Sequence, residues 1–313
     1  MAEALAYTPY DGSRRPFSIG LKPLDLGRWI EPDGHLVRHL REKERLLAER
    51  PEVVFAAEDG TEAAQAETLD LLAGHLETCF PDLYGRDGKS LTVPSAGVRV
   101  ALGDDDEPAL MRAARLVQED LVLMRAGDGG YRLAAAALCF PSAWSLREKF
   151  GQTLDGVHEH VPGYKERLGV RMNRIFETLK VDMPTWRINW SLYADDQLHH
   201  PESKSRPRDW FSAGDGSDAF VRVERQTLRR LPRSGDILFT IKIYVDPVAA
   251  FRSHPDGAAL AEGLRRDILA LDEGELRYKA LIQDRDRIAG MLERLAHELR
   301  QAGPVQEAVS NPI

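Results

Sequence analysis

The stretch FVRVERQTLRRLPRSGDILFTIKIYV, residues 220–245, decides the fold of this chain. Residues 220–231 and 237–245 both have the composition of β-strands. Pro232 and Ser234-Gly235 lie between them and are typical of a hairpin turn. Apolar side chains fill alternate positions of the second strand and therefore share one face, because side chains alternate along a strand. These side chains are Ile237, Phe239, Ile241, Ile243 and Val245.

The first strand of this hairpin carries polar side chains in a regular pattern. Arg222, Glu224 and Gln226 share one face if the strand is regular. Such a face suits a polarised pocket for a small polar ligand. The alternative is an exposed edge strand, whose charges prevent pairing with other chains. The residues alone leave both interpretations open.

A further strand is predicted upstream, at residues 185–193. Its alternation places Trp186 and Trp190 on one face and Arg187 and Asn189 on the other. Either this is a half-buried strand whose tryptophans pack on helices, or its polar face contributes to a site. Tyr278-Lys279 lies in a helix-like stretch, and we expect both residues on the surface.

Much of the remaining chain has the periodicity of helices. Residues 1–33 are expected to be irregular, and 91–102 and 131–140 to have strand character. The polar segment 194–219 is long for a loop and is either a disordered insert or a lid or docking loop. Residues 303–313 are expected to form a loose tail. Helices are expected at 35–50, 61–79, 108–124, 142–150, 154–158, 163–180 and 258–302, the last as two helices that meet near 272–275.

The composition excludes several classes of protein. Of the 313 residues, 43% are apolar, which indicates a globular chain of one large or two ordinary domains. The net charge of −8 argues against nucleic-acid binding, and no apolar run is long enough to span a membrane. Cys79 and Cys139 are too few for a structural zinc or iron–sulfur site. Glycine-rich nucleotide motifs, GxSxG and HExxH are absent. We expect a cytoplasmic protein.

The segment His158-Glu159-His160 is a candidate metal site. The two histidines are two positions apart, so on a helix they point to different sides. A neutral imidazole is the commonest metal ligand in proteins and also a proximal haem ligand. The alternative is that both histidines lie in a turn that ends a helix and bind nothing.

Several blocks of this sequence occur together, in the same order, in one known family. The chain resembles the haem-dependent oxidative N-demethylases, which include the haem α subunit of dimethylamine monooxygenase. The resemblance covers residues from about 20 to about 280, nearly the whole chain. The blocks are Leu21–Asp33, Val117–Leu121, Cys139–Trp144, Glu148–Gly151, His158, Val161–Tyr164, Arg187–Trp190, Arg222–Leu228, Arg230–Pro232 and Tyr278-Lys279.

The resemblance implies an α+β fold in which a haem-binding, PAS-like antiparallel sheet is flanked by helices. Residues 127–250 would form this core. Residues 1–126 would be a mostly helical N-terminal extension packed on it, and 251–313 C-terminal helices and a tail. All three parts would belong to one integrated globular unit.

The resemblance also implies roles for individual residues. His158 matches the family's histidine and would bind the iron of haem b, with His160 as the second choice. Arg222 would donate hydrogen bonds to dioxygen at the haem, and Glu224 would hold the alkylammonium substrate by charge. The residues implied to bind the cofactor besides His158 are Arg187, Asn189 and Arg225.

The implied reaction is oxidative N-demethylation of a small secondary amine, such as dimethylamine, to a primary amine and formaldehyde. It consumes O₂ and two electrons. The chain has no flavin or nicotinamide motif, so the resemblance implies a separate NAD(P)H-dependent reductase with flavin and iron–sulfur centres. Two other functions are possible on the same fold: a PAS-type haem sensor of gases or other ligands, and a small-ligand binding protein without catalysis.

Overall fold

The computed structural model describes residues 5–11, 18–103, 106–164, 168–202, 210 and 219–302. Within them, seven antiparallel strands form one open sheet in the order β1-β8-β9-β10-β6-β7-β2. The strands are β1 (Lys22–Pro23), β2 (Phe55–Ala57), β6 (Asp120–Gly127), β7 (Gly130–Ala137), β8 (Thr185–Tyr193), β9 (Phe220–Arg230) and β10 (Ile237–Pro247).

The predicted hairpin is confirmed as β9 and β10. The two strands pair along their whole length, from Phe220 opposite Pro247 to Arg230 opposite Ile237. Strand β8 pairs with the other edge of β9 over all nine of its residues. Strand β9 is therefore held by ladders of hydrogen bonds on both sides, and the alternation of its side chains is fixed.

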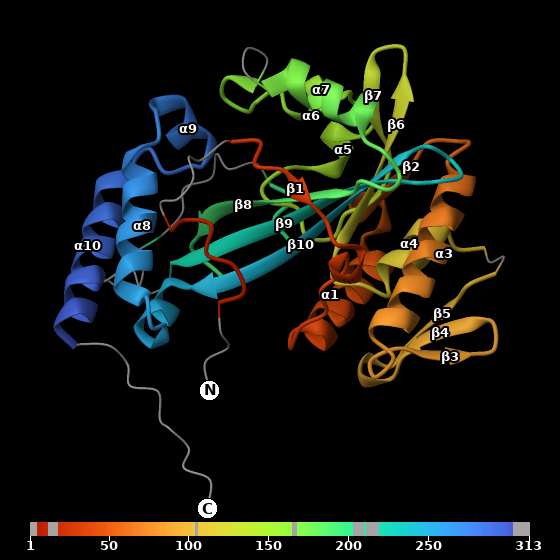
Figure 1. The fold of residues 1–313 in the computed structure, drawn as a ribbon, viewed down its shortest axis with the longest axis horizontal. Coiled ribbons are helices and arrows are strands. Elements are labelled where there is room, and N and C mark those ends of the chain that lie inside the picture. The colour runs from red at the N-terminus through yellow and green to blue at the C-terminus, as the bar shows by residue number, and fades with distance from the viewer. Residues whose placement is uncertain are drawn as a thin grey trace, which may run out of the picture.

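Helices cover both faces of this sheet (Figure 1). Leu228 of β9 and Ile241 and Ile243 of β10 pack beneath the short helices α5, α6 and α7. On the opposite face, Val221 and Val223 pack against α8 and α10, while α1, α3 and α4 cover the other end of the sheet. The fold is thus α+β. The helices are α1 (Leu36–Glu49), α2 (Pro51–Val54), α3 (Glu62–Cys79), α4 (Ala109–Ala114), α5 (Leu146–Lys149), α6 (Leu154–Val157), α7 (Gly169–Thr178), α8 (Gly257–Leu269), α9 (Glu273–Tyr278) and α10 (Arg285–Ala302).

A small second sheet lies beside α3 (Figure 1). It consists of β3 (Gly85–Asp87), β4 (Ser90–Val93) and β5 (Val98–Ala101) in that order. The strand character predicted for residues 91–102 is confirmed, with a single turn of 3-10 helix at Pro94–Ala96 between β4 and β5. The helices predicted at 35–50 and 61–79 are confirmed as α1 and α3.

The helix predicted over residues 108–124 is wrong in its second half. Helix α4 ends at Ala114, and strand β6 begins at Asp120. Strand β6 lies between β10 and β7, and its first five residues are all buried. A strand buried on both faces lacks the alternation that marks a half-exposed strand, so its apolar run is easily mistaken for a helix.

The C-terminal region also differs from its prediction. Three helices, α8, α9 and α10, replace the two that were expected. The break predicted near residues 272–275 is confirmed by the capping box of α9, in which Asp272 and Glu275 cap each other's backbone N–H groups. The additional break lies between Tyr278 and Arg285, where Ala280 has a positive φ of 55°. Residues 303–313, predicted as a tail, and most of the predicted loop, residues 203–209 and 211–218, lie outside the described residues.

The N-terminal segment is held on the back of β9 and β10 by buried charges. Arg225 of β9 donates to the carbonyl oxygen of Trp29 at 3.0 Å and pairs with Glu31 at 3.2 Å. Tyr244 of β10 also donates to Glu31, at 2.9 Å. Lys242 pairs with Asp33 at 2.8 Å. These contacts fix the segment before α1 on the face opposite α5–α7.

Asp267 of α8 provides a test of this packing. Its carboxyl is buried near Asp11, and burial together with that neighbouring charge raises its pKa from 3.8 to about 6. The folded state therefore favours the protonated form. Stability falls as the pH rises from 3.8 to about 6, and the whole penalty is present above that range.

We predict that Asp267→Asn raises the midpoint of thermal unfolding at about pH 7.5, by about 2–4 °C for each kcal/mol relieved. At about pH 4.5 the gain is smaller, because the wild-type carboxyl is then mostly protonated. Differential scanning calorimetry measures both values. Asp286→Asn, at an exposed position of α10, is the matched control. A gain that is equal at both pH values, or no gain, contradicts the prediction.

Candidate functional site

Five polar side chains share the face of β8 and β9 that lies toward α5–α7. In the register of the sheet, Arg187 lies opposite Gln226 and Asn189 opposite Glu224. Arg222 lies two residues before Glu224 and has the same orientation. We call these five residues the β8–β9 polar face. The alternation of side chains predicted for both strands is confirmed, and it brings four of the predicted site residues together.

Glu224 is a buried carboxylate with one hydrogen bond from its own strand. Its side chain is 9% exposed. Gln226 donates from Nε2 to Glu224 Oε2 at 2.8 Å. No other residue of the described ranges forms a hydrogen bond or ion pair with this carboxylate. Glu224 therefore keeps an anionic oxygen that can accept from a ligand.

Arg187 is a half-buried cation whose Nε is buried and which has no hydrogen-bond acceptor among the described residues. Burial lowers the pKa of the guanidinium, and the charge of Glu224 partly opposes this effect. A charge in such surroundings is costly unless it is paired. Arg187 is therefore suited to an anionic group of a ligand.

Arg222 has the opposite character, because its guanidinium already has several acceptors. It is fully buried and donates to Ser142 Oγ at 2.9 Å. It also donates to the carbonyl oxygens of Phe140 at 2.8 Å and Leu198 at 2.9 Å. Arg222 thus ties the chain after β7 to the chain after β8. Its role as a hydrogen-bond donor to dioxygen stays a prediction. For that role, the guanidinium would have to give up one of its present hydrogen bonds to a protein oxygen and form a new one to dioxygen.

His158 has the hydrogen bonding of a metal-binding imidazole. It follows α6 directly, and its Nδ1 lies 2.8 Å from the carbonyl oxygen of Leu154. Because a carbonyl only accepts, Nδ1 must carry the proton, which leaves the lone pair on Nε2 available. The ring stacks on Tyr164 with centroids 4.5 Å apart and planes inclined by 7°. Ligating histidines are typically oriented by such a hydrogen bond.

The electrostatics around His158 keep its imidazole neutral. Burial lowers its pKa, and the positive charge of Arg187 lowers it further. A neutral imidazole is the form that binds a metal. His160, two residues further on, is exposed. Of the two histidines, only His158 combines partial burial, an oriented ring and the influence of a charge from the β8–β9 polar face.

Arg225 does not lie in this site. The alternation of β9 turns it to the opposite face, where it binds Trp29 and Glu31. The sequence predicts Arg225 as a cofactor-binding residue from its place in a motif. The structure instead gives it contacts with the N-terminal segment, and it is not brought together with His158 or Glu224.

The prediction that Lys279 lies on the surface is wrong. Its ammonium is buried, donates to the carbonyl oxygen of Trp190 at 2.5 Å and lies 4.6 Å from the centroid of the Trp190 ring. Burial lowers its pKa to about 8. Tyr278 lies close enough to Glu224 for the carboxylate to contribute to raising its pKa to about 12, although burial is the larger cause. The sequence did not predict the burial of Lys279, because α9 has only six residues and is too short to show which of its sides is buried.

Helix α9 also contacts the turn that carries His158. A Cβ atom added at Gly274 would lie 3.5 Å from Cβ of Pro162, so the two backbones approach closely. The segment that bears Tyr278 and Lys279 therefore spans from the His158 turn to the free edge of β8. It closes one side of the β8–β9 polar face.

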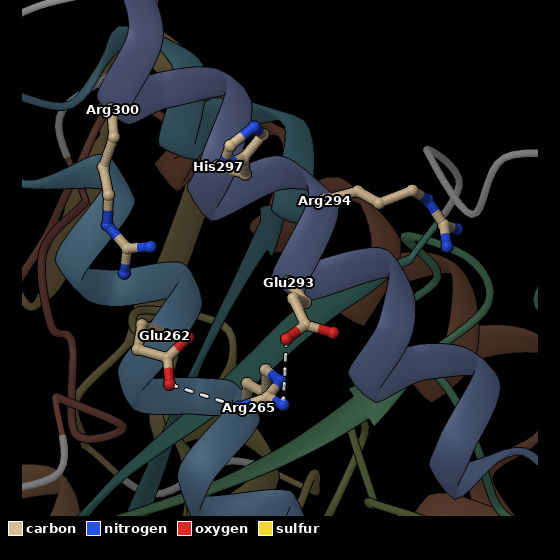
Figure 2. Close-up of a pocket in the computed structure, with 6 residues that line it drawn as sticks. All are labelled: Glu262, Arg265, Glu293, Arg294, His297 and Arg300. Carbon is tan, nitrogen blue, oxygen red and sulfur yellow. Dashed lines mark hydrogen bonds and ion pairs between the residues drawn. The ribbon is translucent and has the colours of Figure 1, made fainter.

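A concave surface lies between α8 and α10 (Figure 2). Arg265 bridges Glu262 and Glu293 across it, each at 3.3 Å. Since α8 and α10 pack on the opposite face of the sheet, this groove is separate from the β8–β9 polar face. Its lining residues are Glu262, Arg265, Glu293, Arg294, His297 and Arg300.

The described residues contain no group of three or more His, Cys, Asp or Glu side chains arranged to hold a metal ion. No helix among the described residues is both long and apolar enough to cross a membrane.

A model of the family described as haem-dependent oxidative N-demethylase, alpha subunit-like, matches residues 20–289. The match includes His158, the β8–β9 polar face and the Tyr278-Lys279 pair.

We predict that Arg222→Met destabilises the protein by about 3–5 kcal/mol, because the substitution leaves several buried carbonyl oxygens without a donor. Urea unfolding measures the loss. Hydrogen exchange should also become faster in residues 139–143 and 197–200 than elsewhere in the sheet. Arg171→Met, at an exposed position of α7, is the control. Unchanged stability would show that these hydrogen bonds do not hold the two segments.

Proposed function

The chain belongs to the haem-dependent oxidative N-demethylase alpha subunit-like family, and we propose from this premise that it is a haem-dependent monooxygenase acting on a small secondary amine. The observation that carries the proposal is the orientation of His158, whose Nδ1 is committed to Leu154 and whose Nε2 is free. The reaction would be R₂N–CH₃ + O₂ + 2e⁻ + 2H⁺ → R₂N–H + HCHO + H₂O. For dimethylamine the products would be methylamine and formaldehyde.

The residues present fit a haem. His158 offers one neutral nitrogen ligand, and Arg187 offers a half-buried cation without an acceptor among the described residues, as a haem propionate requires. Asn189 lies beside Arg187 on the same face and would extend this polar edge. We infer that haem b binds between the His158 turn and the β8–β9 polar face. When bound, the haem supplies the oxygen chemistry, while the protein supplies position and polarity.

The antiparallel sheet and the short helices over it support a PAS-like haem-binding core at residues 127–250. Strands β7, β8, β9 and β10 lie within those limits, and α5, α6 and α7 are the helices that would cover the cofactor. The sheet continues beyond these limits into β6, which starts at Asp120. The flanking parts would be the N-terminal residues 1–126 and the C-terminal residues 251–313.

Glu224 would bind the substrate. An alkylammonium ion that enters the site meets one buried carboxylate, and an ion pair with hydrogen bonds is the strongest contact available to it. Arg222 and Lys279 donate to backbone carbonyl oxygens and form no hydrogen bond or ion pair with Glu224, although the charge of Glu224 acts on both. The carboxylate therefore keeps its charge for the amine and orients its N-methyl group.

Electrons would come from a partner. A family described as alpha subunit-like implies other subunits. Cys79 is exposed and Cys139 buried, and two separate thiols cannot hold an iron–sulfur cluster. We propose a separate NAD(P)H-dependent reductase that carries flavin and iron–sulfur centres, and a cytoplasmic location for the assembly.

Haem loading combined with amine titration tests the proposed function. We predict that the haem-loaded chain shows a Soret band that dimethylamine shifts, and that it forms formaldehyde when reduced chemically in air. Glu224→Gln should retain haem and weaken amine binding at least about tenfold, because a charge-assisted hydrogen bond is lost. Glu159→Gln, at an exposed site next to His158, is the control. A Soret band that no small amine shifts would favour a sensor over an enzyme.

The ligand assignment has its own prediction. His158→Ala should lose the haem or change its absorption spectrum strongly, because no oriented imidazole remains in the turn after α6 to bind the iron. His160→Ala should keep the wild-type spectrum, since His160 is exposed. Absorption spectra of both variants after haem supplementation measure the difference. The reverse result would assign the iron to His160, and no haem in any preparation would favour a ligand-binding protein without the cofactor.

A further inference from the structure

The single hydrogen bond within the β8–β9 polar face constrains the carboxylate of Glu224. The donor is Gln226 Nε2, which lies 2.8 Å from Oε2. The two residues are two positions apart on β9, a strand paired on both sides, so neither backbone can shift to lengthen the contact. The bond therefore fixes the rotation of the carboxylate as well as its position.

Oε1 is the oxygen of Glu224 that keeps both lone pairs for a ligand, whereas Oε2 has already accepted one hydrogen bond. Oε2 accepts from Gln226, and no residue of the described ranges donates to Oε1. Oε1 is also absent from the buried atoms that lack partners, so it borders open space. A carboxylate held in this way presents one acceptor in one direction, rather than a charge that is free to rotate.

Arg187 is the cation on the β8–β9 polar face that has no hydrogen-bond partner among the described residues. Arg187 lies directly opposite Gln226 in the register, and Glu224 is its diagonal neighbour. Diagonal side chains in a sheet lie about 7–8 Å apart at their origin, within the reach of an arginine. No ion pair joins Arg187 and Glu224 among the described residues, although the charge of Glu224 acts on the Arg187 guanidinium, and Gln226 holds Oε2 of the carboxylate by a hydrogen bond.

We propose that Gln226 is a positioning residue, and that the oxygen it leaves free selects alkylammonium ions carrying at least one N–H group. This inference rests on the proposed function and narrows its substrate class. Protonated secondary and tertiary amines both satisfy the oriented oxygen. A quaternary ammonium ion carries the same charge but has no N–H to donate, so it loses the hydrogen bond.

Isothermal titration calorimetry of the haem-loaded chain tests the inference with dimethylammonium, trimethylammonium and tetramethylammonium chloride. We expect the wild type to bind trimethylammonium at least about tenfold more tightly than tetramethylammonium, since one charge-assisted hydrogen bond separates them. In Gln226→Met, which keeps the length of the side chain but cannot donate, we expect this selectivity to fall toward unity. The affinity for dimethylammonium should fall by about tenfold.

A double-mutant cycle separates positioning from a general structural effect. If Gln226 acts through Glu224, Gln226→Met should have no effect beyond about twofold in the Glu224→Gln background. Gln152→Met, at an exposed position, is the matched control and should leave all affinities unchanged. Haem content and circular dichroism establish that each variant is folded.

The failures are distinguishable. If the wild type binds haem and amine but Gln226→Met has wild-type affinity and selectivity, the positioning role is overturned and the proposed function stands. Equal affinity of the wild type for trimethylammonium and tetramethylammonium overturns the N–H selection. Additive effects in the cycle show that Gln226 does not act through Glu224. A wild type that takes up no haem and binds no amine overturns the proposed function, and this inference with it.

Discussion

Strand β9 determines most of what this molecule can do, because it is paired along its length with β8 on one side and β10 on the other. In such a strand, a shift of the pairing register by one residue would move every side chain to the opposite face of the sheet. Glu224 and Gln226 therefore point toward α5–α7, and Arg225 between them points to the N-terminal segment. One sequence motif thus contributes to a candidate site and also anchors the segment that contains Trp29 and Glu31.

Several cations of this structure are buried, and their hydrogen-bond acceptors distinguish those that hold the fold together from one that is suited to bind a ligand. Arg222, Arg225 and Lys279 each donate to backbone carbonyl oxygens, which binds distant segments together. Arg187 differs, since no nitrogen of its guanidinium forms a hydrogen bond with another described residue. An uncompensated charge of this kind is costly to folding and is expected where a ligand supplies the counter-charge. That contrast supports the placement of an anionic cofactor beside Arg187.

Much of this arrangement could be predicted from the sequence, because alternation within a strand is a local property. It correctly grouped Arg187, Asn189 and Glu224 on the strand faces where they are found. Strand β6 was missed, since a strand buried on both faces has no alternation to detect. The place of Arg225 within its motif did not reveal that it faces the N-terminal segment. Burial of Lys279 depends on α9 contacting the edge of β8, a long-range contact that no local pattern encodes.

The crystal structure of the haem-loaded chain would test the central proposal most directly. We predict iron bonded to Nε2 of His158, with Nδ1 still donating to Leu154, and a propionate at Arg187 on the β8–β9 polar face. Iron bonded to His160, or a haem bound on the α8–α10 side of the sheet, would contradict the account.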